Sequence, residues 1–233
     1  MQVQPGGLMR TLYLWFVLAF AIMAYGFWPS VHGDFGPIDP LRWVHGTLAA
    51  GWMALLVAQS WLIGHGHWRL HGRLGRASRY VTPLLVISSL FVVRDMLGPR
   101  SHFSRDLRLT LAWADLISLT LFSGLYVAAT VYRRSLQLHA RFMAATVFIV
   151  LPPAIGRAYG PLFGGLAPAL APSYWTVELA LVVLILWDAV HRRLLAPFPI
   201  ALAGTLAMQA TMFAAPRFAP YVAFATWLGL PPA

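Results

Sequence analysis

The sequence predicts an all-α integral membrane protein, a bundle of seven transmembrane helices forming one domain over residues 1–233. Of its 233 residues, 59% are hydrophobic and only 10% are charged, whereas about a quarter of a soluble domain is charged. The apolar composition extends along the whole chain, and no polar stretch is long enough to build a separate soluble domain. Apolar runs of about 20 residues, the length of a spanning helix, alternate with short loops that carry arginine.

We expect the spanning helices at residues 11–30, 42–64, 79–98, 107–131, 139–160, 174–191 and 198–215. The first run follows Arg10 and is too long and bulky for a cleaved secretory signal, so it is expected to remain as a helix. The last run could continue through "RFAPYVAFATWLGL", but Pro216 and Pro220 interrupt it. We therefore expect a kinked or interfacial tail after the seventh helix.

Arginines set the predicted orientation. The loops "HGHWRLHGRLGRASR", "YRRSLQLHARF" and "HRRLLAP" follow the second, fourth and sixth runs, so they lie on one side, the cytoplasm. The N-terminus is then inside, in a bacterial inner membrane. One loop, "PRSHFSRDLR", opposes this orientation because it places three arginines outside.

The composition also excludes several functions. The net charge of +10 comes from arginine alone, because the chain has no lysine. Without lysine no retinal Schiff base can form, so seven helices do not indicate a rhodopsin. Without cysteine there are no disulfides, thiolates or iron–sulfur clusters. Arginines in short loops fit anionic lipid and topology better than nucleic acid, which we do not expect as a partner.

A short phrase occurs twice, as "LHGRLG" from residue 70 and "LHARFM" from residue 138. Each copy opens an odd-numbered helix at its cytoplasmic end, which predicts that His71 and His139 lie at equal depth. The alternative is that loops at a membrane interface simply share arginine and histidine.

Ionisable residues at membrane depth are costly and are functional candidates by default. An outer layer takes residues from five helices: His45, Arg94, Asp95, Asp115, Arg157 and Glu178, with Glu178 expected to open the sixth helix. These residues could form a binding layer, or static ion pairs that join helix ends.

An inner layer holds His71, His139, Arg141, Asp188 and His191. Asp188 and His191 are three residues apart and therefore share a helix face. Histidines with a carboxylate could bind a metal, or could lie in water. His71 and His139, at equal depth, also meet the minimum for the two axial ligands of a heme b.

Helical spacing links the two layers. His139 and Arg157 are eighteen residues apart, five turns of a continuous helix, so they are expected to share a face. His45, Trp52 and Gln59, each seven apart, predict a similar stripe facing the bundle from the second helix. The proline pair in "LPPAIGR" predicts a bend in the fifth helix.

These motifs resemble a widespread set of uncharacterised bacterial multi-helix membrane proteins. The pattern corresponds here to His45, Gln59, His71, Arg76, His139, Arg141, Met143 and Arg157. Gly72 stands where the family pattern has arginine after the second histidine, although Arg73 follows. The resemblance implies the architecture and these residues, but no assigned activity. A looser resemblance, to transmembrane two-heme cytochromes b, implies a heme between the third and fifth helices.

Three functions remain open from the sequence. A heme-linked electron-transfer protein is narrowly ahead, with His71 and His139 as ligands and no other cofactor expected. A transporter or proton-coupled channel for a small solute would use the outer layer. An accessory subunit of a larger membrane complex would use the abundant aromatic side chains as contact surface. Enzymatic activity is undecided; for a lipid-modifying enzyme, the chain shows no nucleophile with a base at helical spacing.

Overall fold

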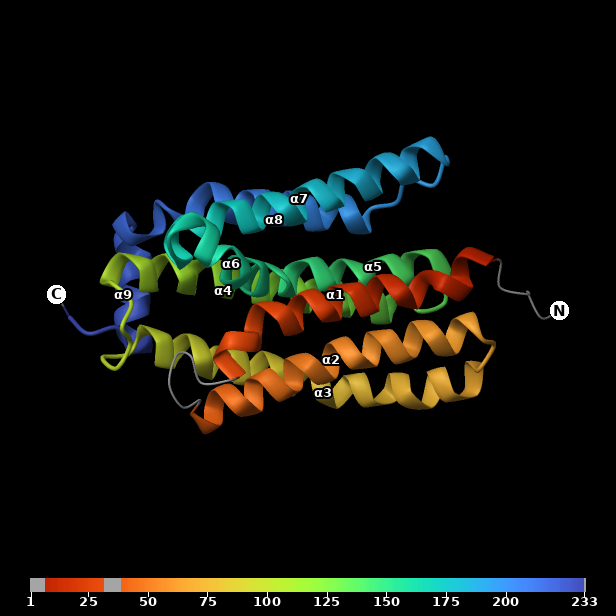
Figure 1. Ribbon diagram of the computed structural model, residues 1–233, viewed down its shortest axis with the longest axis horizontal. Coiled ribbons are helices and arrows are strands. Elements are labelled where there is room, and N and C mark those ends of the chain that lie inside the picture. Colours follow the sequence, from red (N-terminus) through yellow and green to blue (C-terminus); the bar gives the residue numbers. More distant parts are fainter. Residues whose placement is uncertain (1–6, 32–38, 233) are drawn as a thin grey trace. The chain divides into compact units, whose positions relative to one another are not determined.

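The computed structural model describes residues 7–31 and 39–232, and every regular element in these ranges is a helix (Figure 1). This confirms the all-α prediction. The elements are α1 (Gly7–Val31), α2 (Pro40–Gly64), α3 (Trp68–Leu97), α4 (Arg105–Val131), α5 (Leu136–Val150), α6 (Pro152–Phe163), α7 (Leu166–Val190), α8 (Pro197–Met212), the short 3-10 helix η1 (Ala215–Arg217) and α9 (Ala219–Leu228).

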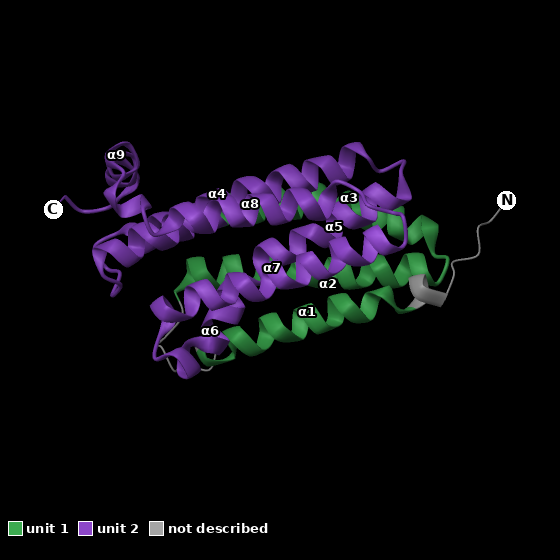
Figure 2. Ribbon diagram, turned by 90° about the horizontal axis from the view of Figure 1, so that it is seen from above, with its two compact units in different colours: residues 1–88 green, residues 89–233 purple. Residues whose placement is uncertain are grey.

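The chain forms two compact units, coloured separately in Figure 2. Unit 1 spans Met1–Ser88 and unit 2 spans Ser89–Ala233, so the boundary lies inside α3. In unit 1, α1 packs against α2. In unit 2, α4 packs against α5 and α8, and α7 packs against α6 and α8.

Six helical segments of the described chain are long and apolar enough to cross a membrane. They are Thr11–Pro29, Pro40–Gly64, Trp68–Leu97, Arg105–Val131, Leu136–Phe163 and Leu166–Val190. Their most apolar windows are only 22% to 50% buried within the protein, which means that much apolar side-chain surface faces outward, as lipid-facing surface does. The expected seventh span, α8, has 16 residues, or about 24 Å of helix against a hydrocarbon core of about 30 Å.

Two helices begin at least two turns earlier than their hydrophobicity predicts. Helix α3 begins at Trp68 instead of residue 79, so Arg69, Arg73, Arg76 and Arg79 lie on a helix and not in a loop. Arginine is a good helix former, and its long side chain reaches water from a helix that extends beyond the apolar layer. Helix α7 begins at Leu166 instead of residue 174, with Pro168 and Pro172 in its first two turns.

The predicted bend in the fifth span is confirmed. Helix α5 ends at Val150 and α6 starts at Pro152, with Leu151 at the junction. Proline has no backbone N–H group. The first positions of a helix tolerate this, because an N–H group there would have no partner within the helix. Because the helix is interrupted, the expected continuous helix of five turns from His139 to Arg157 is wrong: the two residues belong to α5 and α6.

Residues after α8 form a separate short helix, as the two prolines predicted. Helix α9 runs across the ends of α4 and α8 (Figure 1). The Tyr221 hydroxyl donates to the Leu109 carbonyl at 2.8 Å, and Arg105 Nη1 donates to the Pro231 carbonyl at 2.6 Å. The indole of Trp113 packs edge-on against Tyr221. These contacts attach α9 to the first turns of α4.

The arginines that opposed the predicted orientation have structural partners here. Arg108 Nη1 donates to the carbonyls of Leu97 and Gly98, at 3.3 Å and 3.0 Å. Those carbonyls lie at the C-terminal end of α3, where helical partners are missing and a cation is favoured. Arg105 binds the tail as described above. Two of the three arginines in this loop therefore serve helix capping and packing.

Candidate functional site

The predicted stripe of α2 faces α3 within unit 1. His45 Nδ1 lies 3.2 Å from Ser88 Oγ, and Gln59 Nε2 donates to the backbone carbonyl of His71 at 3.2 Å. Trp52, between them, is fully buried. The stripe is therefore confirmed as a face that packs inside the unit. Gln59 is itself buried, and its Oε1 has no hydrogen-bond partner among the described residues.

The two copies of the repeated phrase both open helices, as predicted. His71 is the fourth residue of α3, and His139 is the fourth residue of α5. Their surroundings differ. The His139 Nδ1 lies 2.7 Å from the backbone carbonyl of Ala129, so this nitrogen carries the proton and Nε2 is the basic one. The His71 backbone instead accepts the hydrogen bond from Gln59.

Arg141 and Asp188 form a bidentate ion pair between α5 and α7. Arg141 Nε and Nη2 each lie 2.7 Å from a carboxylate oxygen of Asp188. His191, the cap residue of α7, is exposed; its Nδ1 contacts the Trp187 carbonyl, and its ring lies against that indole. Asp188 is buried, so the two residues do not share an environment. Among the described residues no three histidine, aspartate or glutamate side chains gather into a metal site.

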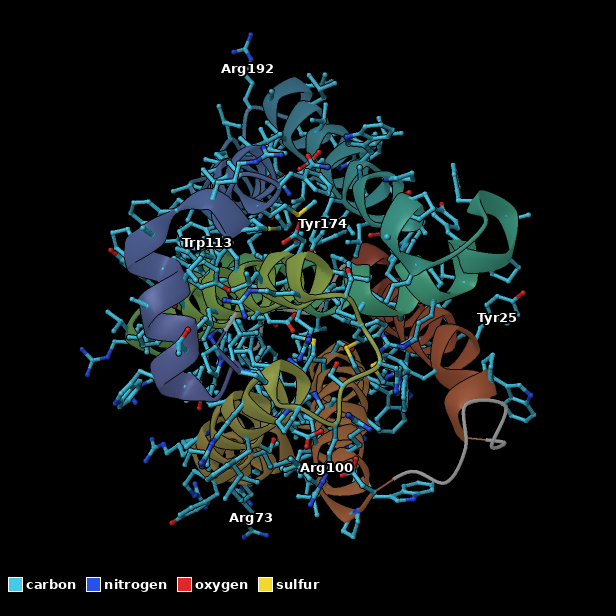
Figure 3. All side chains as sticks on the ribbon, turned by 90° about the vertical axis from the view of Figure 1, so that its left-hand side faces the viewer. Tyr25, Arg73, Arg100, Trp113, Tyr174 and Arg192 are labelled. Carbon is cyan, nitrogen blue, oxygen red and sulfur yellow. The ribbon has the colours of Figure 1, made fainter. Side chains whose placement is uncertain are left out.

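Part of the outer layer comes together inside unit 2. Asp115 on α4 is close enough to Arg157 on α6 for their opposite charges to attract. Tyr174 on α7 is close enough to Asp115 and Glu178 for their negative charges to act on its hydroxyl group. Tyr174 is buried between α4 and α7 (Figure 3), in a cluster with Ala114. We call Asp115, Arg157, Tyr174 and Glu178 the ionisable cluster.

Glu178 lies much deeper than the sequence indicated. Glu178 was expected to open the sixth helix, but the corresponding helix, α7, begins at Leu166, twelve residues before Glu178. Glu178 is therefore about 18 Å along α7, near the middle of its length. Asp115 is about 15 Å from the start of α4 by the same measure. The Glu178 side chain is buried, and its Oε1 has no hydrogen-bond partner within the described chain.

Other residues of the predicted outer layer lie elsewhere. Arg94 and Asp95 are in the last turn of α3, where the Arg94 side chain approaches Gly229 after α9. His45 belongs to unit 1. Arg157 Nη1 also donates to the Pro153 carbonyl at 2.8 Å, which connects its side chain to the α5–α6 junction.

Tyr174 was missed by sequence reasoning. It precedes Glu178 by four residues and so occupies the same face of α7. Searching one turn on either side of the only glutamate would have found it.

Comparisons with protein-family models, curated proteins and solved structures found no match for the chain. The function is therefore argued from the geometry alone.

Proposed function

We propose that the chain is a seven-helix protein of a bacterial inner membrane, with its N-terminus in the cytoplasm. Helix α8 supports the count of seven because it packs along α4, α5 and α7. The arginines in the first turns of α3 and those that follow α4 and α7 support the orientation.

We propose further that the ionisable cluster binds a small polar solute or a proton, and that the protein moves it across the membrane. The observation that carries this proposal is the buried Glu178 carboxyl near the middle of α7, with one oxygen lacking a hydrogen-bond partner among the described residues. A carboxyl group in hydrocarbon needs a proton, a cation or a donor ligand. Arg157 and Tyr174 supply a positive charge and a hydroxyl to the same cluster.

The junction between α5 and α6 supports the same proposal. Pro152 and Pro153 cannot donate to the carbonyls of the preceding turn. Carbonyls released in this way are tolerated at membrane depth where they line a polar cavity or find substitute donors. Arg157 already donates to one carbonyl of this segment, so a solute bound by the cluster would meet backbone acceptors beside it.

The test measures proton flux into proteoliposomes that contain the purified protein and a pH-sensitive dye. We expect Glu178→Gln to abolish proton movement driven by a solute gradient, and Asp115→Asn and Arg157→Gln to reduce it. Asp106→Asn is the matched control, because Asp106 lies on α4 but is exposed in its first turn. If Glu178→Gln and Asp106→Asn both transport like the unmodified chain, the proposal is wrong.

Heme b binding is a second candidate, and the orientation of His139 favours it. A histidine whose Nδ1 donates to a backbone carbonyl presents Nε2 as a ligand, which is the arrangement common in metal sites. The repeated phrase in the sequence predicts His71 as the second axial ligand, and heme would supply one-electron transfer. Protein expressed with added heme should then show a Soret band that His139→Ala and His71→Ala both remove, whereas His65→Ala keeps it. Colourless protein would contradict this candidate.

A further inference from the structure

A surface groove of about 840 Å³ runs along unit 1 between α1, α2 and α3. Its lining includes three small residues, Ala54 and Ala58 on α2 and Ala77 on α3. The lining also includes larger apolar side chains, such as Phe20 on α1 and Leu74 on α3. Arg73 is the one charged residue in the lining.

Along α2 the groove is slightly shorter than one membrane leaflet is thick. On α2 its lining extends from Ala54 to Leu62, about 12 Å of helix, against about 15 Å for half of the hydrocarbon core. It occupies the part of the unit next to the short connection between α2 and α3, since it includes the end of α2 and the beginning of α3. Trp61 lines this end of the groove, and Trp68 opens α3 beside it; tryptophan is typical of the headgroup level.

The groove is next to positively charged arginines that no described acidic side chain neutralises. Arg69, Arg73 and Arg76 follow one face of α3 at spacings of four and three residues, and all three are exposed. None of them has a hydrogen-bond or ion-pair partner in the described part of the chain. Residues 40–94 contain no aspartate or glutamate, and Asp39, at the other end of α2, is bound to Arg42 at 3.0 Å.

We infer that this groove is a specific site for one anionic phospholipid, with an acyl chain in the groove and its phosphate on Arg73 and Arg69. The apolar lining excludes a soluble anion as the main ligand, because most of the contact is with aliphatic surface. The arginines distinguish an anionic headgroup from a zwitterionic one, since a basic pocket on the cytoplasmic side attracts acidic lipid. The inference depends on the membrane helices of unit 1 but not on the ionisable cluster of unit 2.

Native mass spectrometry of the full-length protein titrated with phosphatidylglycerol or phosphatidylcholine of the same acyl chains would test this site. We expect one phosphatidylglycerol molecule to be retained in preference to phosphatidylcholine. Arg73→Gln should weaken phosphatidylglycerol binding about fivefold, and Arg69→Gln with Arg73→Gln about 25-fold, with little effect on phosphatidylcholine. Ala54→Phe fills the groove and should weaken binding of both lipids.

The matched control is Arg133→Gln with Arg134→Gln, which removes two exposed arginines after α4 and should leave lipid binding unchanged. Glycerol phosphate, the headgroup without chains, should not compete. Equal retention of the two lipids, equal weakening by the control pair, or effective competition by glycerol phosphate would each overturn the inference. If Ala54→Phe lowers the melting temperature, Ala58→Leu provides the second groove-filling variant; normal lipid binding by a folded groove-filled variant would also overturn it.

Discussion

Replacing Asp188 by asparagine would leave the Arg141 guanidinium without its carboxylate inside unit 2. The pair is partly withdrawn from solvent, with side-chain exposures of 19% for Arg141 and 7% for Asp188. It also offsets an unfavourable position, because Asp188 lies in the last turn of α7, where a negative charge opposes the helix dipole.

The magnitude follows from this geometry. Two opposite charges about 4 Å apart attract by about 4 kcal/mol at an effective dielectric constant of about 20, and breaking a buried pair by removing one partner typically costs about 3–5 kcal/mol. We expect Asp188→Asn and Arg141→Gln each to lower the free energy of unfolding by roughly this amount. The double variant should lose less than the sum of the two, with a coupling energy of about 2–3 kcal/mol.

The assay is reversible unfolding of the purified protein in mixed micelles of increasing sodium dodecyl sulfate content, followed by circular dichroism. The control is the exposed pair Arg42–Asp39, with exposures of 47% and 38%, for which Arg42→Gln and Asp39→Asn should give a coupling energy below about 1 kcal/mol. A coupling energy for Arg141 and Asp188 no larger than that of the control would refute the reasoning.

Three further predictions concern packing, capping and pH. A Cβ atom at Gly204 would lie 2.6 Å from a methyl group of Leu121 on α4. Because Leu121 would have to move, Gly204→Val should lower the free energy of unfolding by about 1–3 kcal/mol; Gly124→Ala, in open space on α4, should be neutral or slightly stabilising in the same micelle titration. Arg108→Gln removes the cap from the α3 end at Leu97 and should cost about 1–3 kcal/mol, with faster amide hydrogen exchange in that last turn as its signature. Burial raises the pKa of Tyr221, so the folded chain keeps this phenol proton to higher pH than the unfolded chain. The stabilisation from this phenol should be complete below about pH 10 and should be lost as pH rises further. Tyr221→Phe should reduce the loss of melting temperature at high pH. An unchanged dependence of melting temperature on pH would contradict the raised pKa of Tyr221.

Residues whose role depends on local spacing were predictable from sequence. The seven-residue period of His45, Trp52 and Gln59 predicted the buried face of α2, and the proline pair predicted the end of α5, because both features act within a few turns of helix. Hydropathy failed at the N-terminal parts of α3 and α7, since it measures apolar length and not where helical hydrogen bonding begins. The depth of Glu178 was missed for that reason.

Contacts between distant parts of the chain were beyond sequence reasoning. Arg141 and Asp188 were assigned to one layer, but their direct pairing requires α5 and α7 to be neighbours at that level. Arg105 was counted only as a charge in an outer loop, and nothing near it in the sequence indicates the Pro231 carbonyl that it binds.

The attachment of α9 to α4 has a consequence for biogenesis. Arg105 and Pro231 are separated by 126 residues, and Tyr221 and Leu109 by 112. A ribosome therefore completes α4 before the residues that bind its first turns have been synthesised. Attachment of α9 is therefore a late step in the assembly of unit 2, and a chain that stalls before α9 would leave the first turns of α4 without these partners.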